Sequence, residues 1–141
     1  MKINALQKGL GEACEGEVLV LNGAFSARYD LDIKTGEFLR PNIVEDGVSV
    51  KGKILVADRA KGGVASSWLF HEMVRLGTAP KALIFNNAGP VMIQASAFSG
   101  ISILDKFDGN ICSQLNNGQR VFVSPKDGVI EILNNGGVAI Q

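Results

Sequence analysis

The stretch that decides the fold is KILVADRAKGGVASSWLFHEMVRLGTAPKALIF, residues 53–85. It contains two continuously apolar runs, Ile54–Ala57 near its start and Ala82–Phe85 at its end. Uninterrupted apolar runs of this length indicate strands that are covered on both faces, as in the mostly parallel sheet of an α/β protein. We therefore expect two buried strands, Lys53–Ala57 and Lys81–Phe85.

The segment between these runs has the pattern of a helix, at about Val64–Leu76. Leu69, Met73 and Leu76 recur at spacings of four and three residues, which places them on one face of a helix. Gly77 follows directly, as expected of a residue that ends a helix. Strand, helix and strand together predict a βαβ crossover over residues 53–85.

Short runs rich in Val, Ile and Leu continue the β pattern on both sides, punctuated by glycines. The further predicted strands are Glu17–Leu21, Ile101–Leu104, Arg120–Val123 and Val129–Leu133. Asp127-Gly128 between the last two is typical of a hairpin turn. We see no repeat and no linker, and we expect one α/β domain over residues 1–141.

Composition limits the classes of function. Lys and Arg together number 14 and so do Asp and Glu, which gives a formal net charge of zero and no sign of a nucleic-acid or membrane surface. No apolar run approaches the roughly 20 residues of a bilayer span, and the first residues lack a signal-peptide pattern, so we expect a cytoplasmic protein. Cys14 and Cys112 are far apart, and two cysteines do not make a metal centre, so we expect no cofactor bound by this chain alone.

The loop after the first buried strand is the best candidate for chemistry. Gly62 and Gly63 would let the backbone approach a ligand closely, and the following helix start offers outward-pointing amides that favour an anion. Lys61 adds a positive charge that could hold a substrate carboxylate or phosphate, and Ser66 and Ser67 add hydroxyl groups. The alternative remains open that the glycines form a tight turn and that a serine only caps the helix.

Other polar residues lie outside this loop. Asn86-Asn87-Ala88-Gly89-Pro90 has the composition of a turn, yet it follows the second buried strand and ends at the same sheet edge as the glycine loop. Asn86 and Asn87 are therefore candidate substrate ligands. His71, the single histidine, falls inside the predicted helix, where we expect a structural role.

The order of these features resembles the small subunit, or swivelling domain, of the aconitase X family. The resemblance covers most of the chain and rests on an ordered set of segments rather than on one diagnostic motif. Those segments are Gly16–Val20, Phe25-Ser26, Asp32–Gly36, Val48–Val50, Gly52–Val56, Lys61-Gly62, Gly77–Ala82, Asn117–Val121 and Asp127-Gly128.

The resemblance implies a swivelling β/β/α domain that closes over a large catalytic subunit, whose cysteines hold an iron–sulfur cluster. Members of the family are hydro-lyases that dehydrate cis-3-hydroxy-L-proline in bacteria and phosphomevalonate in archaea. In aconitase-like enzymes a serine of the swivelling domain's glycine-rich loop acts as the base, and the cluster iron takes the leaving hydroxyl. Fixed positive charge and amide dipoles would stabilise the alkoxide that such a base needs.

This chain departs from the family pattern at one position. Relatives have Gly-Lys-Gly-Ser followed three residues later by a second serine, whereas this chain has Ala60-Lys61-Gly62-Gly63. Gly63 thus occupies the place of the first serine, and Ser67 matches the second, with Ser66 beside it. We expect a dehydratase small subunit with Ser67 or Ser66 as its base. The alternative is a non-catalytic binding or regulatory partner that keeps the swivel fold.

Overall fold

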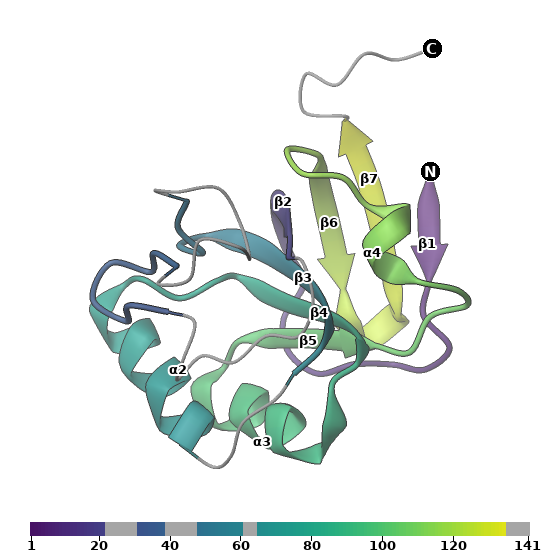
Figure 1. Cartoon of the computed structure of the whole chain (residues 1–141). Helices are drawn as coiled ribbons and strands as arrows, with labels where there is room; N and C mark the ends of the chain where they lie inside the picture. Colours follow the sequence, from purple (N-terminus) through teal and green to yellow (C-terminus); the bar gives the residue numbers. More distant parts are fainter. Residues whose placement is uncertain (22–30, 39–47, 61–64, 135–141) are drawn as a thin grey trace.

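The computed structural model describes residues 1–21, 31–38, 48–60 and 65–134, with residues 65–67 described by their backbone (Figure 1). Within these ranges seven strands form one sheet in the order β1-β7-β6-β2-β3-β4-β5. The strands are β1 Lys2–Asn4, β2 Cys14–Val20, β3 Lys53–Arg59, β4 Ala82–Asn87, β5 Ser102–Asp105, β6 Arg120–Ser124 and β7 Val129–Asn134. The helices are α2 Ala65–Leu76, α3 Gly89–Ser99 and α4 Ile111–Gln114.

The parallel half of the sheet consists of β2, β3, β4 and β5. All residues of Ile54–Ala57 and Ala82–Phe85 have no exposed surface, which confirms that both runs are strands covered on both faces. The chain enters α2 between β3 and β4, and these two strands pair in parallel, so the predicted βαβ crossover is also confirmed. Burial of such apolar runs supplies much of the free energy of folding, at about 25 cal/mol per Å².

Helices α2 and α3 cover one face of the parallel half (Figure 1). The buried side of α2 is formed by Phe70 and Met73, with Leu69 partly buried. Leu76 was predicted to lie on the buried face, but it is 40% exposed. The buried face of α2 is centred on Phe70 and Met73 instead. Gly77 ends the helix as expected, and the following Thr78 amide donates to the Met73 carbonyl at 2.9 Å.

The antiparallel half joins β2 to β6, β6 to β7 and β7 to β1, and its strands run in a markedly different direction from β3–β5 (Figure 1). The predicted hairpin is confirmed: a 3-10 turn at Pro125–Asp127 leads into Gly128, whose φ of 66° lies in the left-handed region that glycine tolerates. A second core of buried aliphatic residues lies against both halves and α4. The predicted fold class, a β/β/α arrangement, is therefore confirmed.

The expected turn at residues 86–90 is wrong. Asn86 and Asn87 continue β4, and α3 begins at Gly89, with a proline in its first turn. The helix was missed because two of its buried positions are serines, Ser96 and Ser99, which hide the apolar period. Both hydroxyls are satisfied locally, by donation to the carbonyls of Ile101 and Ser96, so they are buried without large cost.

Candidate functional site

The candidate loop joins the end of β3 to the start of α2. Strand β3 ends at Arg59 and α2 begins at Ala65, so Ser66 and Ser67 fall in the first helical turn, as the sequence predicted. Lys61, Gly62 and Gly63 lie outside the described residues. The first turn of α2 contains no acidic residue, so the positive end of the helix dipole is not neutralised by its own side chains.

The neighbouring strands bring more polar residues to the same edge of the sheet. Because β3, β4 and β5 are parallel, their carboxyl ends lie side by side, next to the start of the candidate loop. Alternation along the strands sends Asn86 to the α4 face and Asn87 to the face covered by α2 and α3. The two candidate ligands therefore do not line one pocket together.

Asn86 is held by hydrogen bonds within the chain. Its Nδ2 donates to Asp58 Oδ1 at 2.9 Å and to Asn110 Oδ1 at 2.8 Å. Its Oδ1 accepts from the Ile111 amide at 2.7 Å. Since Asn110 also accepts from the Cys112 amide and so caps α4, this network ties the ends of β3 and β4 to that helix. The geometry suits a residue that positions the edge of the sheet.

Asn87 faces the helix layer and is exposed. Its Oδ1 accepts from Lys106 Nζ at 2.9 Å, and its Cα lies opposite that of Arg59 in the sheet register. Lys106 is the one residue other than glycine in the described ranges with a positive φ, at 69°. Sequence reasoning missed Lys106, although it follows a predicted strand directly and the carboxyl-end rule applies to it equally.

Asp105 supports the connection between β4 and α3. It is 4% exposed, and its two carboxyl oxygens accept from Gln7 Nε2 at 3.0 Å and from the Ala88 amide at 2.9 Å. A buried carboxyl group with both oxygens bonded is stable only while these donors remain in place. Asp105 therefore fixes the backbone at the entry to α3.

The cysteines do not form a metal centre in the described part of the chain. Both are half-buried, and burial raises the pKa of the Cys14 and Cys112 thiols, the latter with a further contribution from the negative charge of Asp58. A raised pKa keeps a thiol protonated and a poor ligand. Among the described residues no three His, Cys, Asp or Glu side chains are grouped as a metal ion requires.

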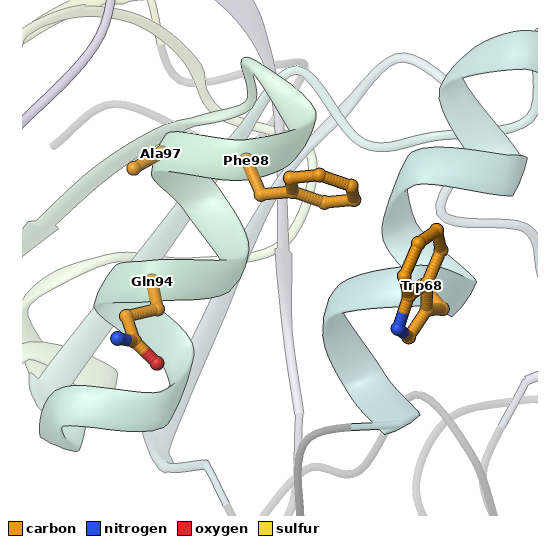
Figure 2. Close-up of a pocket in the computed structure, with 4 residues that line it drawn as sticks. All are labelled: Trp68, Gln94, Ala97 and Phe98. Atoms are coloured by element: carbon orange, nitrogen blue, oxygen red, sulfur yellow. The ribbon is translucent and has the colours of Figure 1, made fainter.

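An apolar groove of about 500 Å³ opens between α2 and α3 and is lined by Trp68, Gln94, Ala97 and Phe98. Figure 2 shows Phe98 pointing from α3 toward Trp68 on α2. The two rings meet edge to face with centroids 5.2 Å apart, although Trp68 is 64% exposed and Phe98 49% exposed. His71, also exposed, lies 4.8 Å from the Phe98 ring. An exposed aromatic cluster directly after Ser67 is typical of a surface that meets another protein.

Comparison with known proteins decides the family. A family model described as the aconitase X swivel domain matches residues 5–132. The chain belongs to the aconitase X swivel domain family.

Relatives by sequence and a solved structure both point to aconitase X enzymes. A protein of Pyrococcus horikoshii named phosphomevalonate dehydratase small subunit is 34% identical over 93% of this chain and 96% of its own length. A protein of the same name from Pyrococcus abyssi is 34% identical over 89% of this chain and 95% of its own length. The crystal structure of Thermococcus kodakaraensis aconitase X in its holo form matches with a TM-score of 0.84 and 31% identity, over 95% of this chain and 99% of that one.

These matches confirm the predicted class of protein. The swivel-domain chain is a dehydratase-type subunit, that is, a hydro-lyase component, because relatives matching nearly its whole length bear that name. Among the helices of the described ranges, none is both long and apolar enough to cross a membrane. The assignment of individual site residues stays a prediction.

Proposed function

We propose that this chain is the small subunit of a cytoplasmic, two-chain phosphomevalonate dehydratase. The observation that carries the proposal is the end-to-end match to proteins of that name, at 34% identity over 93% of the chain. The position of the candidate loop supports it, since the loop lies at the carboxyl end of a central parallel strand, where α/β proteins bind small molecules.

The reaction removes one proton and one hydroxyl group from neighbouring carbons of the substrate. The proton leaves from the carbon next to the carboxylate, the electron pair of that bond forms the new double bond, and the hydroxyl group departs, so that the balance is one molecule of water. An iron–sulfur cluster held by the large subunit would supply Lewis-acid chemistry for the departing hydroxyl group.

The serine hydroxyl at the start of α2 takes the proton in this proposal. Ser67 matches the family's second serine and falls in the first helical turn, where the backbone amides stabilise negative charge on its oxygen. Ser66 is the rival candidate. Lys61, Gly62 and Gly63 hold the substrate carboxylate by charge and by close backbone approach.

The partnership with a large subunit has support from the surface next to the loop. The exposed Trp68–Phe98 pair begins one residue after Ser67. A partner that receives Ser67 in its active site must contact the outer side of α2 as well. Aromatic side chains in such a position are typical of residues that dominate the affinity of protein interfaces.

One observation favours a second candidate function. Gly63 stands where the aconitase X resemblance places a serine, and a chain without its base would act as a binding or regulatory partner of the large subunit. In that case the complex forms and the loop still meets the partner, but no serine of this chain affects the rate of water loss.

The test is anaerobic co-expression of this chain with a large subunit of the aconitase X family. Phosphomevalonate should lose water only when both chains are present, and the small chain alone should be folded, colourless and inactive. cis-3-Hydroxy-L-proline, the other substrate of the family, is assayed in parallel. Turnover of hydroxyproline but not of phosphomevalonate would overturn the substrate assignment, and turnover by the isolated chain would overturn the two-chain assignment.

The interface is tested by a matched pair of phenylalanine variants. Phe98→Glu places a charge in the groove and should abolish stable association with the large subunit. Phe122→Glu is the control, because Phe122 is also exposed, at 39%, but lies on β6 in the antiparallel half. Equal association of both variants in size-exclusion chromatography would exclude the groove from the interface.

A further inference from the structure

Two cationic residues, Arg59 and Lys106, lie next to Asn87 at the carboxyl edge of the parallel strands. Lys106 follows β5, and its Nζ donates to Asn87 Oδ1 at 2.9 Å. Arg59 ends β3 directly opposite Asn87, and opposed residues of neighbouring strands send their side chains to the same face. Strands of a sheet are about 4.8 Å apart, so a guanidinium group from Arg59 reaches the space beside Asn87.

The backbone of Lys106 is held in a conformation that lysine ordinarily avoids. Its φ of 69° lies in the left-handed region, where the Cβ of a residue other than glycine is crowded against the backbone. Hydrogen bonds on both sides maintain it, because the Lys106 amide donates to the Asn86 carbonyl and the Lys106 carbonyl accepts from the Leu6 amide. A glycine would adopt this turn without strain, so the turn itself does not explain the lysine.

The charges at this edge are not neutralised within the described part of the chain. The ion pairs described there join other residues, and neither Arg59 nor Lys106 takes part in them. The nearest acidic neighbours in sequence are engaged elsewhere: Asp58 accepts from Asn86 on the opposite face, and Asp105 accepts from Gln7 and Ala88. The start of α3 lies beside Asn87 as well, and its N-cap residue, Ala88, makes no side-chain hydrogen bond to it.

We propose that Arg59, Asn87 and Lys106 form a binding site for the phosphate group of the substrate. This inference rests on the proposed function and adds which part of the molecule this chain recognises. A phosphate monoester carries a charge between −1 and −2 near neutral pH, which two cations and an amide donor match in charge and in hydrogen bonds. The glycine loop, which starts next to Arg59, then remains for the carboxylate end, where the proton is removed.

In this proposal the two ends of the substrate bind at different places along the sheet edge. The carboxylate is bound between β3 and α2, and the phosphate at the ends of β4 and β5. Binding energy from the phosphate, which does not react, orients the carbon that loses its proton. Arg59, Asn87 and Lys106 are therefore specificity-determining residues, and a substrate without phosphate binds weakly.

The first test uses the assembled two-chain enzyme and conservative pairs of variants. Lys106→Gly and Arg59→Gln should each raise KM for phosphomevalonate about tenfold or more with kcat nearly unchanged, whereas Lys106→Arg and Arg59→Lys should stay close to the wild type. Lys51→Gln is the charge control, because Lys51 is exposed and precedes β3 at the end of that strand opposite to Arg59. Values of KM within twofold of the wild type for both neutral variants would overturn the proposal. A fall in kcat at constant KM would overturn it as well.

The second test separates the site from the proposed function. The isolated full chain is titrated with inorganic phosphate while the backbone amide signals of Arg59, Asn87 and Lys106 are followed by NMR. Millimolar phosphate should shift these signals in the wild type and not in Lys106→Gly, and acetate at the same concentration should shift them far less. An absent response, or an equal response to acetate, would overturn the phosphate site. A clear phosphate response in a chain whose assembled enzyme does not turn over phosphomevalonate would refute the proposed substrate and retain the anion site.

Discussion

The two helical crossovers of the parallel sheet, β3-α2-β4 and β4-α3-β5, differ in the connection that leads from strand to helix. Between β4 and α3 a single residue, Ala88, separates strand from helix, and its amide is bonded to the buried Asp105. Between β3 and α2 the connection covers residues 60–64 and contains two glycines and a lysine. The short connection fixes the sheet edge, whereas the long one carries groups suited to a ligand.

The comparison shows that some residues at this sheet edge hold the structure together, whereas others are placed to bind a ligand. Asn86 has three of its hydrogen-bonding positions occupied within the chain, so it serves the framework. Asn87, one residue later, turns to the opposite face and meets Lys106. Substitutions in the first crossover should therefore alter activity, and substitutions of the framework residues Asn86 and Asp105 in the second crossover should mainly alter stability.

The largest effect is expected at the serines of the first crossover. Ser67→Ala should lower kcat by about a thousandfold or more with little change in KM, because the hydroxyl acts on the proton only in the transition state. Steady-state kinetics of the assembled enzyme measure this, with Ser66→Ala as the matched variant. If both variants keep nearly full kcat, the base belongs to the large subunit and the regulatory alternative gains support.

The framework of the second crossover is tested by Asp105→Ala. The change leaves the Ala88 amide and the Gln7 side chain without their buried acceptor, and it should lower the free energy of unfolding by about 2–3 kcal/mol. Urea unfolding of the isolated chain measures the loss. Asp108→Ala, at an exposed position three residues later, should change stability by less than about 0.5 kcal/mol. Similar losses in the two variants would contradict the assigned role of Asp105.

Variants of Gly62 and Gly63 test whether the β3–α2 connection serves activity rather than stability. Gly62→Val or Gly63→Val should lower kcat/KM about ten- to a hundredfold, because a β-branched side chain blocks close backbone approach to the substrate. The melting temperature should change little, since a glycine has no side chain that could add to the buried core. Kinetics and thermal unfolding of the same preparations are compared. Parallel losses of activity and stability would show that the glycines serve a structural turn.

The smallest effect is expected at Lys61. Lys61→Ala should raise KM about tenfold and leave kcat nearly unchanged, because one charge-assisted hydrogen bond to the substrate carboxylate is lost. Lys51→Ala is the control, since Lys51 is exposed and precedes β3 at the opposite end of the strand. An unchanged KM would remove Lys61 from the substrate site.

Several features of the fold were predictable because they depend on local patterns. The two central strands are apolar throughout, and the hairpin has Asp127-Gly128 at a turn that needs a positive φ. Helix α3 was not predicted, although Pro90 and Gly100 are the start and stop signals that would have indicated it. Strand β1 has three residues and gains its structure by pairing with β7, so it has no period of its own to detect.

The sequence by itself determined that the chain contains a βαβ crossover with a glycine-rich, cationic connection, because apolar runs and glycines act over a few residues. It also determined the resemblance to aconitase X. Only the tertiary structure decided that Asn86 and Asn87 lie on different faces of the sheet and that Lys106, just after β5, bonds Asn87 at the end of β4. The reason is physical: alternation within a strand is local, but its register against neighbouring strands depends on contacts between residues far apart in the chain.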